Sequence, residues 1–442
     1  MRLDGRLKTE GVLGLASALC RRFAACATAL GRATVLRGAA IAALAILPSS
    51  VFRPVHAQEP AALRVSVLTF GPGDLVFERF GHNALRIVDP ASGSDLAYNW
   101  GMFSFDQPNF LGRFLSGDTQ YWVEAFPSQP LIDFYVRADR EAVEQVLELT
   151  PSEAAELKAF VENNVRGDNK FYRYQYFLDN CSTRVRDALN LVMGGSLERR
   201  FAPITTTWSF RDESIRLTGP TYYSQLGIEL ALGPSADAPL SAWQAMFVPM
   251  RLRDYLREVT VPAPSGGTRP LVAQETVLHS PTGRPAEPEA RRGLTLGALG
   301  PVLGAWMLML VPTSAEARRK RRLPAAVMLA LFYGVTGLLG SVLLGMWLFS
   351  AHTFWYHNLT LLLCSPLALL AAVLGTRALW RGERSRFALL AVGAVATMAL
   401  LALVVSPFVT QRLAGPLLVL LPGHLGLALV FWRHTAPSVT AN

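Results

Sequence analysis

Cysteine is scarce in this chain, because its 442 residues include only four. Cys20 and Cys26 lie near the N-terminus, and Cys364 lies inside a long apolar run. Cys181 is therefore the only thiol between residues 58 and 290, so this region has no internal disulfide partner for it. The low number excludes the class of small secreted domains that depend on a disulfide framework.

Residues 58–290 also lack an excess of positive charge. They contain 21 Lys and Arg against 29 Asp and Glu, a net charge of −8, although the whole chain carries +9. The basic excess lies in residues 1–57, with a net charge of +6, and in residues 291–442, with +11. An acidic globular region argues against a nucleic-acid partner, and basic residues beside apolar runs are typical of membrane topology signals.

Residues 1–57 predict a targeting segment, either a signal peptide or an N-terminal anchor. Arginines occur through Arg37, residues 39–47 form a short apolar core, and the three residues before Gln58 offer a small-x-small cleavage site. The basic part is unusually long, which leaves open whether translation starts after Met1 or the segment is retained. In both cases we expect the residues from 58 onward to be exported.

The C-terminal third is strongly apolar, and the loops within it differ in charge. Residues 318–322 and 377–386 hold five and four basic residues, whereas the loops 350–358 and 410–415 hold none and one. The positive-inside rule therefore places the exported region on the same side as loop 350–358 and the C-terminus in the cytoplasm. Five runs are each long enough to span a bilayer: 294–312, 324–349, 359–376, 387–409 and 414–432.

These signals divide the chain into five parts. After the targeting segment 1–57 we expect an extracytoplasmic domain at 58–260, a Pro- and Gly-rich linker at 261–292, a transmembrane bundle of about five helices at 293–433 and a cytoplasmic tail at 434–442. Within the extracytoplasmic domain, strands followed by helices predict an α+β fold. Alternation and turn residues predict strands at 63–70, 80–88 and 96–100, and helical patterns predict helices at 140–149, 152–165 and 240–248.

A helix is also predicted directly after Asn180. Apolar residues recur at helical spacing from Cys181 onward, and Gly194-Gly195 provides a stop. Asp179 or Asn180 can cap this helix, which places Cys181 in its first turn. Unpaired amides and the positive end of the helix dipole favour a thiolate there, so Cys181 is a candidate nucleophile.

His82 is the candidate base, at the start of the strand 80–88. Histidine is rare between residues 58 and 290, where the only other one is His279 in the predicted linker. Asn99 or Tyr98, on the next strand, lies within reach of His82 and could orient its ring. The alternative is structural: a lone cysteine on an apolar helix face, like a histidine after a glycine, is most often a packed residue.

The loop 351–358 is predicted to face the same side as Cys181. Its aromatic residues are most simply interfacial anchors. His352, His357 and Asn358 could alternatively touch a substrate headgroup, because polar groups at a membrane boundary are functional candidates. Two histidines alone do not indicate a metal site.

Several motifs occur in order along the chain: Phe80-Gly-His-Asn-Ala-Leu-Arg86, Tyr98-Asn-Trp-Gly-Met-Phe103, Tyr172-Arg-Tyr with Asp179-Asn-Cys-Ser-Thr-Arg184, and Gly227-Ile-Glu-Leu-Ala-Leu-Gly233. Together they resemble the Lnb N-terminal periplasmic domain family, which is named for the lipoprotein N-acylation transacylase. The resemblance covers residues 60–260, and the loop from His352 to Asn358 with the residues after it is similar to the membrane half of long members.

The resemblance implies a permuted papain-like α+β domain, in which histidine precedes cysteine as His82 precedes Cys181 here. It implies acyl transfer from the sn-2 ester of a diacylglyceryl lipoprotein to the amine of its N-terminal cysteine, through a Cys181 thioester. His82 would relay the proton and Asn99 would orient it. The implied partners are diacylglyceryl lipoproteins or membrane lipid, the implied location is the bacterial inner membrane with the domain in the periplasm, and no cofactor or metal is implied.

Two other classes of function stay open. A papain-like peptidase or amidase acting on cell-wall peptide would use the same cysteine and histidine, although a soluble substrate does not need five membrane spans. A non-catalytic membrane receptor or assembly factor would contain Cys181 and His82 only as packed residues. A thiol-reactive acyl probe that labels the protein, but not its Cys181→Ala or His82→Ala variants, would exclude this second class.

Overall fold

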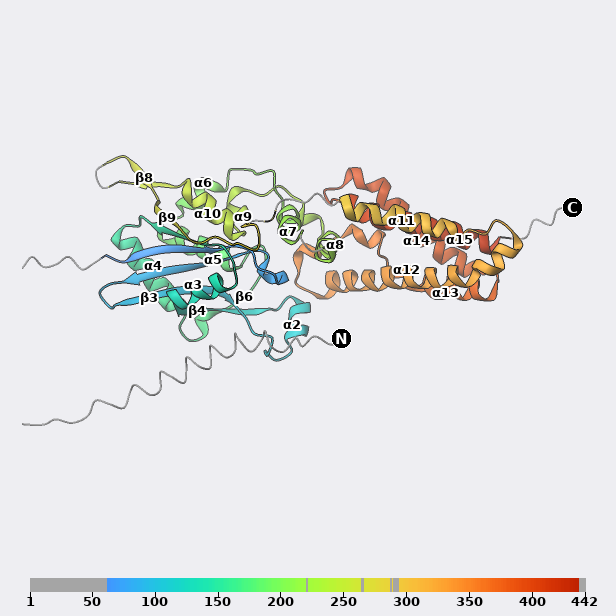
Figure 1. The fold of residues 1–442 in the computed structure, drawn as a ribbon, viewed down its shortest axis with the longest axis horizontal. Helices are drawn as coiled ribbons and strands as arrows, with labels where there is room; N and C mark the ends of the chain where they lie inside the picture. Colours follow the sequence, from blue (N-terminus) through green and yellow to red (C-terminus); the bar gives the residue numbers. More distant parts are fainter. Residues whose placement is uncertain (1–61, 220–221, 264–265, 287, 289–293, 437–442) are drawn as a thin grey trace, which may run out of the picture. The chain divides into compact units, whose positions relative to one another are not determined.

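The computed structural model describes residues 62–436 apart from 220–221, 264–265, 287 and 289–293. The predicted targeting segment 1–57 and residues 437–442 of the predicted tail lie outside the described residues. An α/β domain comes first, and a helical region follows from α11 onward (Figure 1).

A seven-stranded antiparallel sheet forms the centre of the N-terminal domain. Its strand order is β6-β4-β3-β2-β1-β5-β9, so the three predicted strands are confirmed as β1, β2 and β3, and they lie in the interior of the sheet. The register pairs Phe70 with His82 and Leu85 with Tyr98. The strands are β1 (Arg64–Phe70), β2 (His82–Asp89), β3 (Ser94–Met102), β4 (Gln120–Pro127), β5 (Ala142–Leu147), β6 (Phe171–Arg173) and β9 (Val272–His279).

Helices cover both faces of this sheet. Successive strand residues point to opposite faces, so the sheet contributes to two separate clusters of buried side chains. Leu85 and Trp100 lie in one cluster with Leu189 of α5, whereas Phe70 lies in the other with Tyr135 of α3. The covering helices are α3 (Ser128–Arg137), α4 (Pro151–Asn164) and α5 (Cys181–Val192).

The helix predicted at 140–149 is wrong, because residues 142–147 of this range form the strand β5. β5 lies between β1 and β9, and all but one of its residues are buried. The charged residues that suggested a helix surface are paired within the sheet: Glu144 accepts from Arg86 of β2, with 3.0 Å between Oε1 and Nη1. The predicted helix 152–165 is confirmed as α4, and Thr150 and Glu153 form a capping box at its start.

Residues 261–292 are not simply a linker, because they supply β9 to the edge of the sheet. The prolines and glycines that suggested a linker lie before and after this strand, and none lies within it. The helix predicted at 240–248 is reduced to the short α9. The remaining elements of the domain are α6 (Ser196–Phe201), α7 (Phe210–Thr218), α8 (Tyr222–Ala231), α9 (Ala242–Ala245), α10 (Pro249–Arg257), β7 (Thr260–Pro262) and β8 (Thr268–Pro270).

The C-terminal region consists of apolar helices. Within the described residues, four are long and apolar enough to cross a membrane, and they match the predicted spans from residue 324 onward. The first predicted span, 294–312, forms the apolar but shorter α11. The helices of this region are α11 (Leu294–Met309), α12 (Ala315–Phe349), α13 (Leu367–Arg381), α14 (Arg386–Val405) and α15 (Ala414–Thr435).

Two loops of the helical region contact the N-terminal domain. Asn358 is 1 % exposed, and its Nδ2 donates to the backbone oxygens of Leu230 and Ala231 at 2.8 and 2.9 Å. Arg412 donates from Nε to Oδ1 of Asp237 at 3.0 Å. Both loops were predicted on the exported side of the membrane, and their contacts with the exported domain agree with that topology.

Candidate active site

Cys181 is the first residue of α5, as predicted. Asn180 caps the helix, because its Oδ1 accepts hydrogen bonds from the backbone N–H groups of Ser182 and Thr183 at 2.9 and 3.0 Å. The other cap candidate, Asp179, forms an ion pair with a neighbouring arginine instead. The cap fixes where the helix begins and leaves the thiol at the positive end of the helix dipole.

His82 is the first residue of β2, and its ring is supported from the face that α3 covers. The imidazole stacks on the Tyr135 ring, with 6.0 Å between centroids, and Tyr135 stacks in turn on Phe70 at 3.8 Å. Burial raises the pKa of Tyr135, so its hydroxyl stays neutral beside the imidazole. Tyr135 was not identified from the sequence, since it lies in a helix that the sequence analysis did not predict.

Asn99 lies on the same face of the sheet as His82. The register of β2 and β3 places the two residues diagonally across the strands, and His82 Nε2 donates a hydrogen bond to Asn99 Oδ1. This bond assigns the proton of the neutral ring to Nε2 and leaves Nδ1 free to accept a proton. Tyr98, the other candidate, points into the core on the opposite face and is 3 % exposed.

Gly101 lies beside both the cysteine and the histidine. A Cβ atom at this position would lie 3.5 Å from the Cβ of Cys181 and 3.8 Å from Cε1 of His82. Its φ is +94°, and the pairing of β3 with β4 is irregular at this point. A side chain here would enter the space between the two reactive groups. Gly101 lies inside the observed strand β3 but directly after the predicted strand 96–100, and a glycine at such a point is the sequence signal that could have identified this position.

The surroundings of Cys181 favour its thiolate. Burial raises the pKa of the thiol, but the charge of His82, a hydrogen bond with His82 and the backbone N–H groups of Asn83 and Ser182 together lower it below its usual value. The sulfur of Cys181 therefore faces main-chain N–H groups from both β2 and α5. The N–H of Asn83 was not identified from the sequence, because every residue except proline has a backbone N–H and the residue type does not show which of them points at the thiol.

These contacts bring together a thiol, an imidazole and a side-chain amide, the groups expected of a nucleophile, a base and a residue that orients the base. The structure brings Cys181, His82 and Asn99 together from α5, β2 and β3, although 99 positions separate the cysteine from the histidine in the chain. Such an arrangement can attack an ester, thioester or amide carbonyl and carry a proton to the leaving group. It does not by itself select among these substrates.

The loop residues considered as a second catalytic feature are not part of this arrangement. His352 donates from Nε2 to the backbone oxygen of Phe114 at 2.7 Å, and its ring lies 5.9 Å from that of Tyr176. The ring of His357 lies 5.0 Å from that of Trp347. The side-chain amide of Asn358 donates to backbone oxygens of α8, as described above. Asn358 therefore joins the two regions of the chain and does not face solvent.

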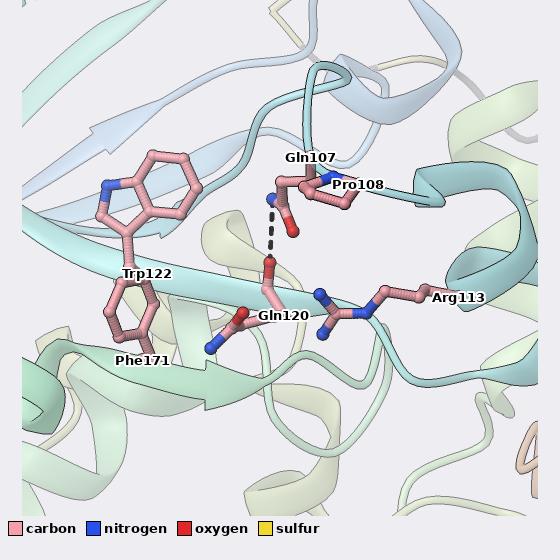
Figure 2. Close-up of a pocket in the computed structure, with 6 residues that line it drawn as sticks. All are labelled: Gln107, Pro108, Arg113, Gln120, Trp122 and Phe171. Carbon is pink, nitrogen blue, oxygen red and sulfur yellow. Dashed lines mark hydrogen bonds between the residues drawn. The ribbon is translucent and has the colours of Figure 1, made fainter.

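A shallow pocket lies elsewhere, at the connection between β3 and β4 (Figure 2). The Arg113 side chain extends toward Gln120, whose backbone oxygen accepts from Gln107 Nε2 at 3.2 Å. The pocket contains none of the three candidate residues, so the chemistry described above is not assigned to it. The lining residues are Gln107, Pro108, Arg113, Gln120, Trp122 and Phe171.

Two family profiles match the chain. One, described as the Lnb N-terminal periplasmic domain, matches residues 56–210 and includes the cysteine, the histidine and the asparagine of the candidate site. The other, described as the Lnb transmembrane domain, matches residues 295–422. No curated protein and no solved structure matches the chain. The chain belongs to the Lnb family and is a membrane protein with an N-terminal periplasmic domain followed by a transmembrane domain.

Proposed function

We propose that this protein is a thiol-dependent acyltransferase of the bacterial inner membrane. It moves an acyl chain from the sn-2 ester of a diacylglyceryl lipoprotein to the amine of the lipoprotein's N-terminal cysteine. The observation that supports this most is the hydrogen-bonded set of Cys181, His82 and Asn99 at the start of a helix in an Lnb periplasmic domain. On this proposal the domain is a permuted papain-like domain, in which histidine precedes cysteine in the chain.

In the first step the thiol becomes acylated. His82 Nδ1 takes the proton of Cys181, and Sγ attacks the carbonyl carbon of the sn-2 ester. The oxyanion of the tetrahedral intermediate accepts a hydrogen bond from the backbone N–H of Cys181, the first residue of α5, because the Asn180 cap already binds the N–H groups of Ser182 and Thr183. The ester C–O bond breaks, the departing alkoxide takes the proton from His82, and the acyl group remains on Sγ as a thioester.

In the second step the amine accepts the acyl group. The neutral α-amine of the lipoprotein's N-terminal cysteine attacks the thioester carbonyl and gives a proton to His82. The C–S bond breaks, and the sulfur regains its proton from His82. The products are an N-acylated lyso-lipoprotein and free Cys181, so atoms and charge balance over the cycle. Asn99 keeps the imidazole in the tautomer that both steps need.

The membrane region supports a lipid substrate. A diacylglyceryl group stays in the bilayer, so an anchored enzyme meets its ester over a short distance and at high effective concentration. Contacts of Asn358 and Arg412 with the periplasmic domain hold that domain near the exported ends of the helices. A water-soluble cell-wall peptide would gain nothing from this arrangement.

Reconstitution with a synthetic diacylglyceryl-cysteinyl peptide tests the proposal. We expect mass spectrometry to show an N-acylated lyso-peptide with the wild-type chain and unchanged peptide with Cys181→Ala. Release of free fatty acid without N-acylation would replace the transferase with a lipid hydrolase. Cleavage of a peptide bond in a cell-wall peptide, with the lipopeptide untouched, would replace it with a peptidase.

A further inference from the structure

Exposed apolar side chains gather beside the candidate active site. We call this group the apolar rim, and each of its members is between 46 and 68 % exposed. Its two parts come from the turn before β2 and from the connection between β3 and β4, which contains α2 (Phe110–Ser116). A patch of this kind is unusual on a surface that faces water. The members are Leu75, Val76, Phe77, Phe105, Leu111, Phe114 and Leu115.

Aromatic contacts join the two parts into one surface. The ring of Phe103 lies 5.6 Å from that of Phe77 and 5.1 Å from that of Phe105. Phe105 contacts Phe110 at 5.1 Å, and Phe110 contacts Phe114 at 6.2 Å. The rim is therefore continuous from the turn before β2 to the end of α2.

The rim adjoins the end of a membrane-spanning helix. α12 ends at Phe349, which is 82 % exposed, and two residues later the N–H of Ala351 donates to the backbone oxygen of Ser116 at 2.8 Å. His352 binds the backbone oxygen of Phe114. The exposed side chains of α2 are thus tied to the point where α12 leaves the bilayer. Apolar and aromatic residues at that level insert among lipid chains and headgroups.

The same rim leads to the nucleophile. Phe103 follows Gly101 by two residues, and Gly101 adjoins the Cβ of Cys181. Phe103 also stacks on Tyr121 at 5.2 Å, and Tyr121 stacks on Tyr174 at 4.2 Å, seven residues before Cys181. A row of rings therefore runs from the loop after α12 to Tyr174, in the segment that precedes α5.

We propose that the apolar rim inserts into the exported leaflet of the membrane and binds the acyl chains of the diacylglyceryl substrate, which brings the ester to Cys181. The occupant is lipid because the rim is apolar and is bonded to the end of a membrane span. The delivery to Cys181 rests on the proposed function. The membrane contact does not rest on it.

Crosslinking tests the membrane contact without any catalysis. The full chain, with p-benzoylphenylalanine in place of Leu111 or Leu115, is reconstituted into vesicles of phosphatidylethanolamine and phosphatidylglycerol that carry radiolabelled acyl chains. The matched control has the same group in place of Val277, which is 55 % exposed on β9 at the opposite end of the sheet order. We expect lipid adducts at 111 and 115 and none above background at 277. Equal labelling at all three positions would overturn the proposal.

Activity measurements test the delivery. We expect Leu111→Ser with Leu115→Ser to slow turnover of the diacylglyceryl peptide in vesicles by about 10-fold, while Val277→Ser has no effect. Iodoacetamide is water-soluble and does not need the rim. We therefore expect it to alkylate Cys181 in the double variant at the wild-type rate. If the double variant lost its alkylation rate by the same factor as its turnover, the rim would only stabilise the fold, and the proposal would be overturned. If Cys181→Ala retains turnover while lipid adducts still form at 111, the proposed function fails and the membrane contact stands.

Discussion

Phe354, in the loop after α12, packs edge-on against Phe177, four residues before Cys181. The ring centroids lie 4.8 Å apart and the ring planes meet at 89°. Phe247 belongs to the same buried cluster, and its backbone oxygen accepts a hydrogen bond from Asn180 Nδ2 at 3.0 Å. The helical region of the chain therefore helps to hold the segment that caps the nucleophile helix.

Phe354→Ala should destabilise the protein by about 3 kcal/mol, because it removes a buried ring from a packed aromatic cluster. Thermal unfolding in detergent measures the loss, and we expect slower alkylation of Cys181 at temperatures where the fold persists. Phe349→Ala is the matched control, since Phe349 is 82 % exposed and its loss should cost less than about 0.5 kcal/mol. Equal melting temperatures for the two variants would show that the loop does not support the domain.

Gly101→Ala should impair the candidate site more than it impairs the fold. The new methyl group would enter the space between Cys181 and His82, and the positive φ would add strain of about 1 kcal/mol. Gly93→Ala is the control, because Gly93 also has a positive φ, of +69°, but a Cβ there meets nothing within 4 Å. We expect the two variants to unfold at similar temperatures, and only Gly101→Ala to lose turnover of the diacylglyceryl peptide. Equal activity in the two variants would contradict the described geometry.

Asn99→Ala should lower kcat by roughly 10- to 100-fold and leave KM nearly unchanged, because it removes only the group that orients His82. Tyr98→Phe should keep wild-type activity, since the Tyr98 ring lies in the core on the opposite face. Steady-state kinetics with the diacylglyceryl peptide measure both variants. A larger effect from Tyr98→Phe than from Asn99→Ala would reverse the assignment of the orienting residue.

The rate of Cys181 alkylation should depend on pH with a midpoint below that of an ordinary thiol. Burial alone raises the pKa of Cys181, whereas the charge and hydrogen bond of His82 lower it. His82→Ala removes both of these lowering contributions, so the midpoint should move to higher pH. Iodoacetamide kinetics between about pH 5 and 10 measure it. An unchanged midpoint in His82→Ala would mean that the imidazole does not interact with the thiol.

Local sequence signals predicted the parts of the fold that local chemistry determines. The cap at Asn180, the capping box before α4 and the first three strands depend on residues close together in the chain, and all are present. The positions of Cys181 and His82 at the starts of their elements follow from the same signals. Their proximity was expected from the family resemblance and not from spacing.

The remaining errors concern residues whose environment is set by distant parts of the chain. β5 has the charged residues of a helix surface, but it becomes a buried strand because Arg86 of β2 neutralises Glu144. β9 lies between proline- and glycine-rich segments, and only its pairing with β5 reveals it as a strand. Asn358 was considered as a contact for a substrate headgroup, yet its side-chain amide binds the backbone oxygens of Leu230 and Ala231 at the end of α8.

The most direct measurement is the intact mass of the denatured protein after brief incubation with a diacylglyceryl-cysteinyl peptide whose amine is blocked by acetylation. The first step can then proceed but the amine cannot accept the acyl group. We expect one acyl chain on the protein, located on Cys181, removable by hydroxylamine and absent from Cys181→Ala and His82→Ala. Acylation that persists in Cys181→Ala, or turnover of the unblocked peptide by that variant, would contradict a catalytic cysteine at this position.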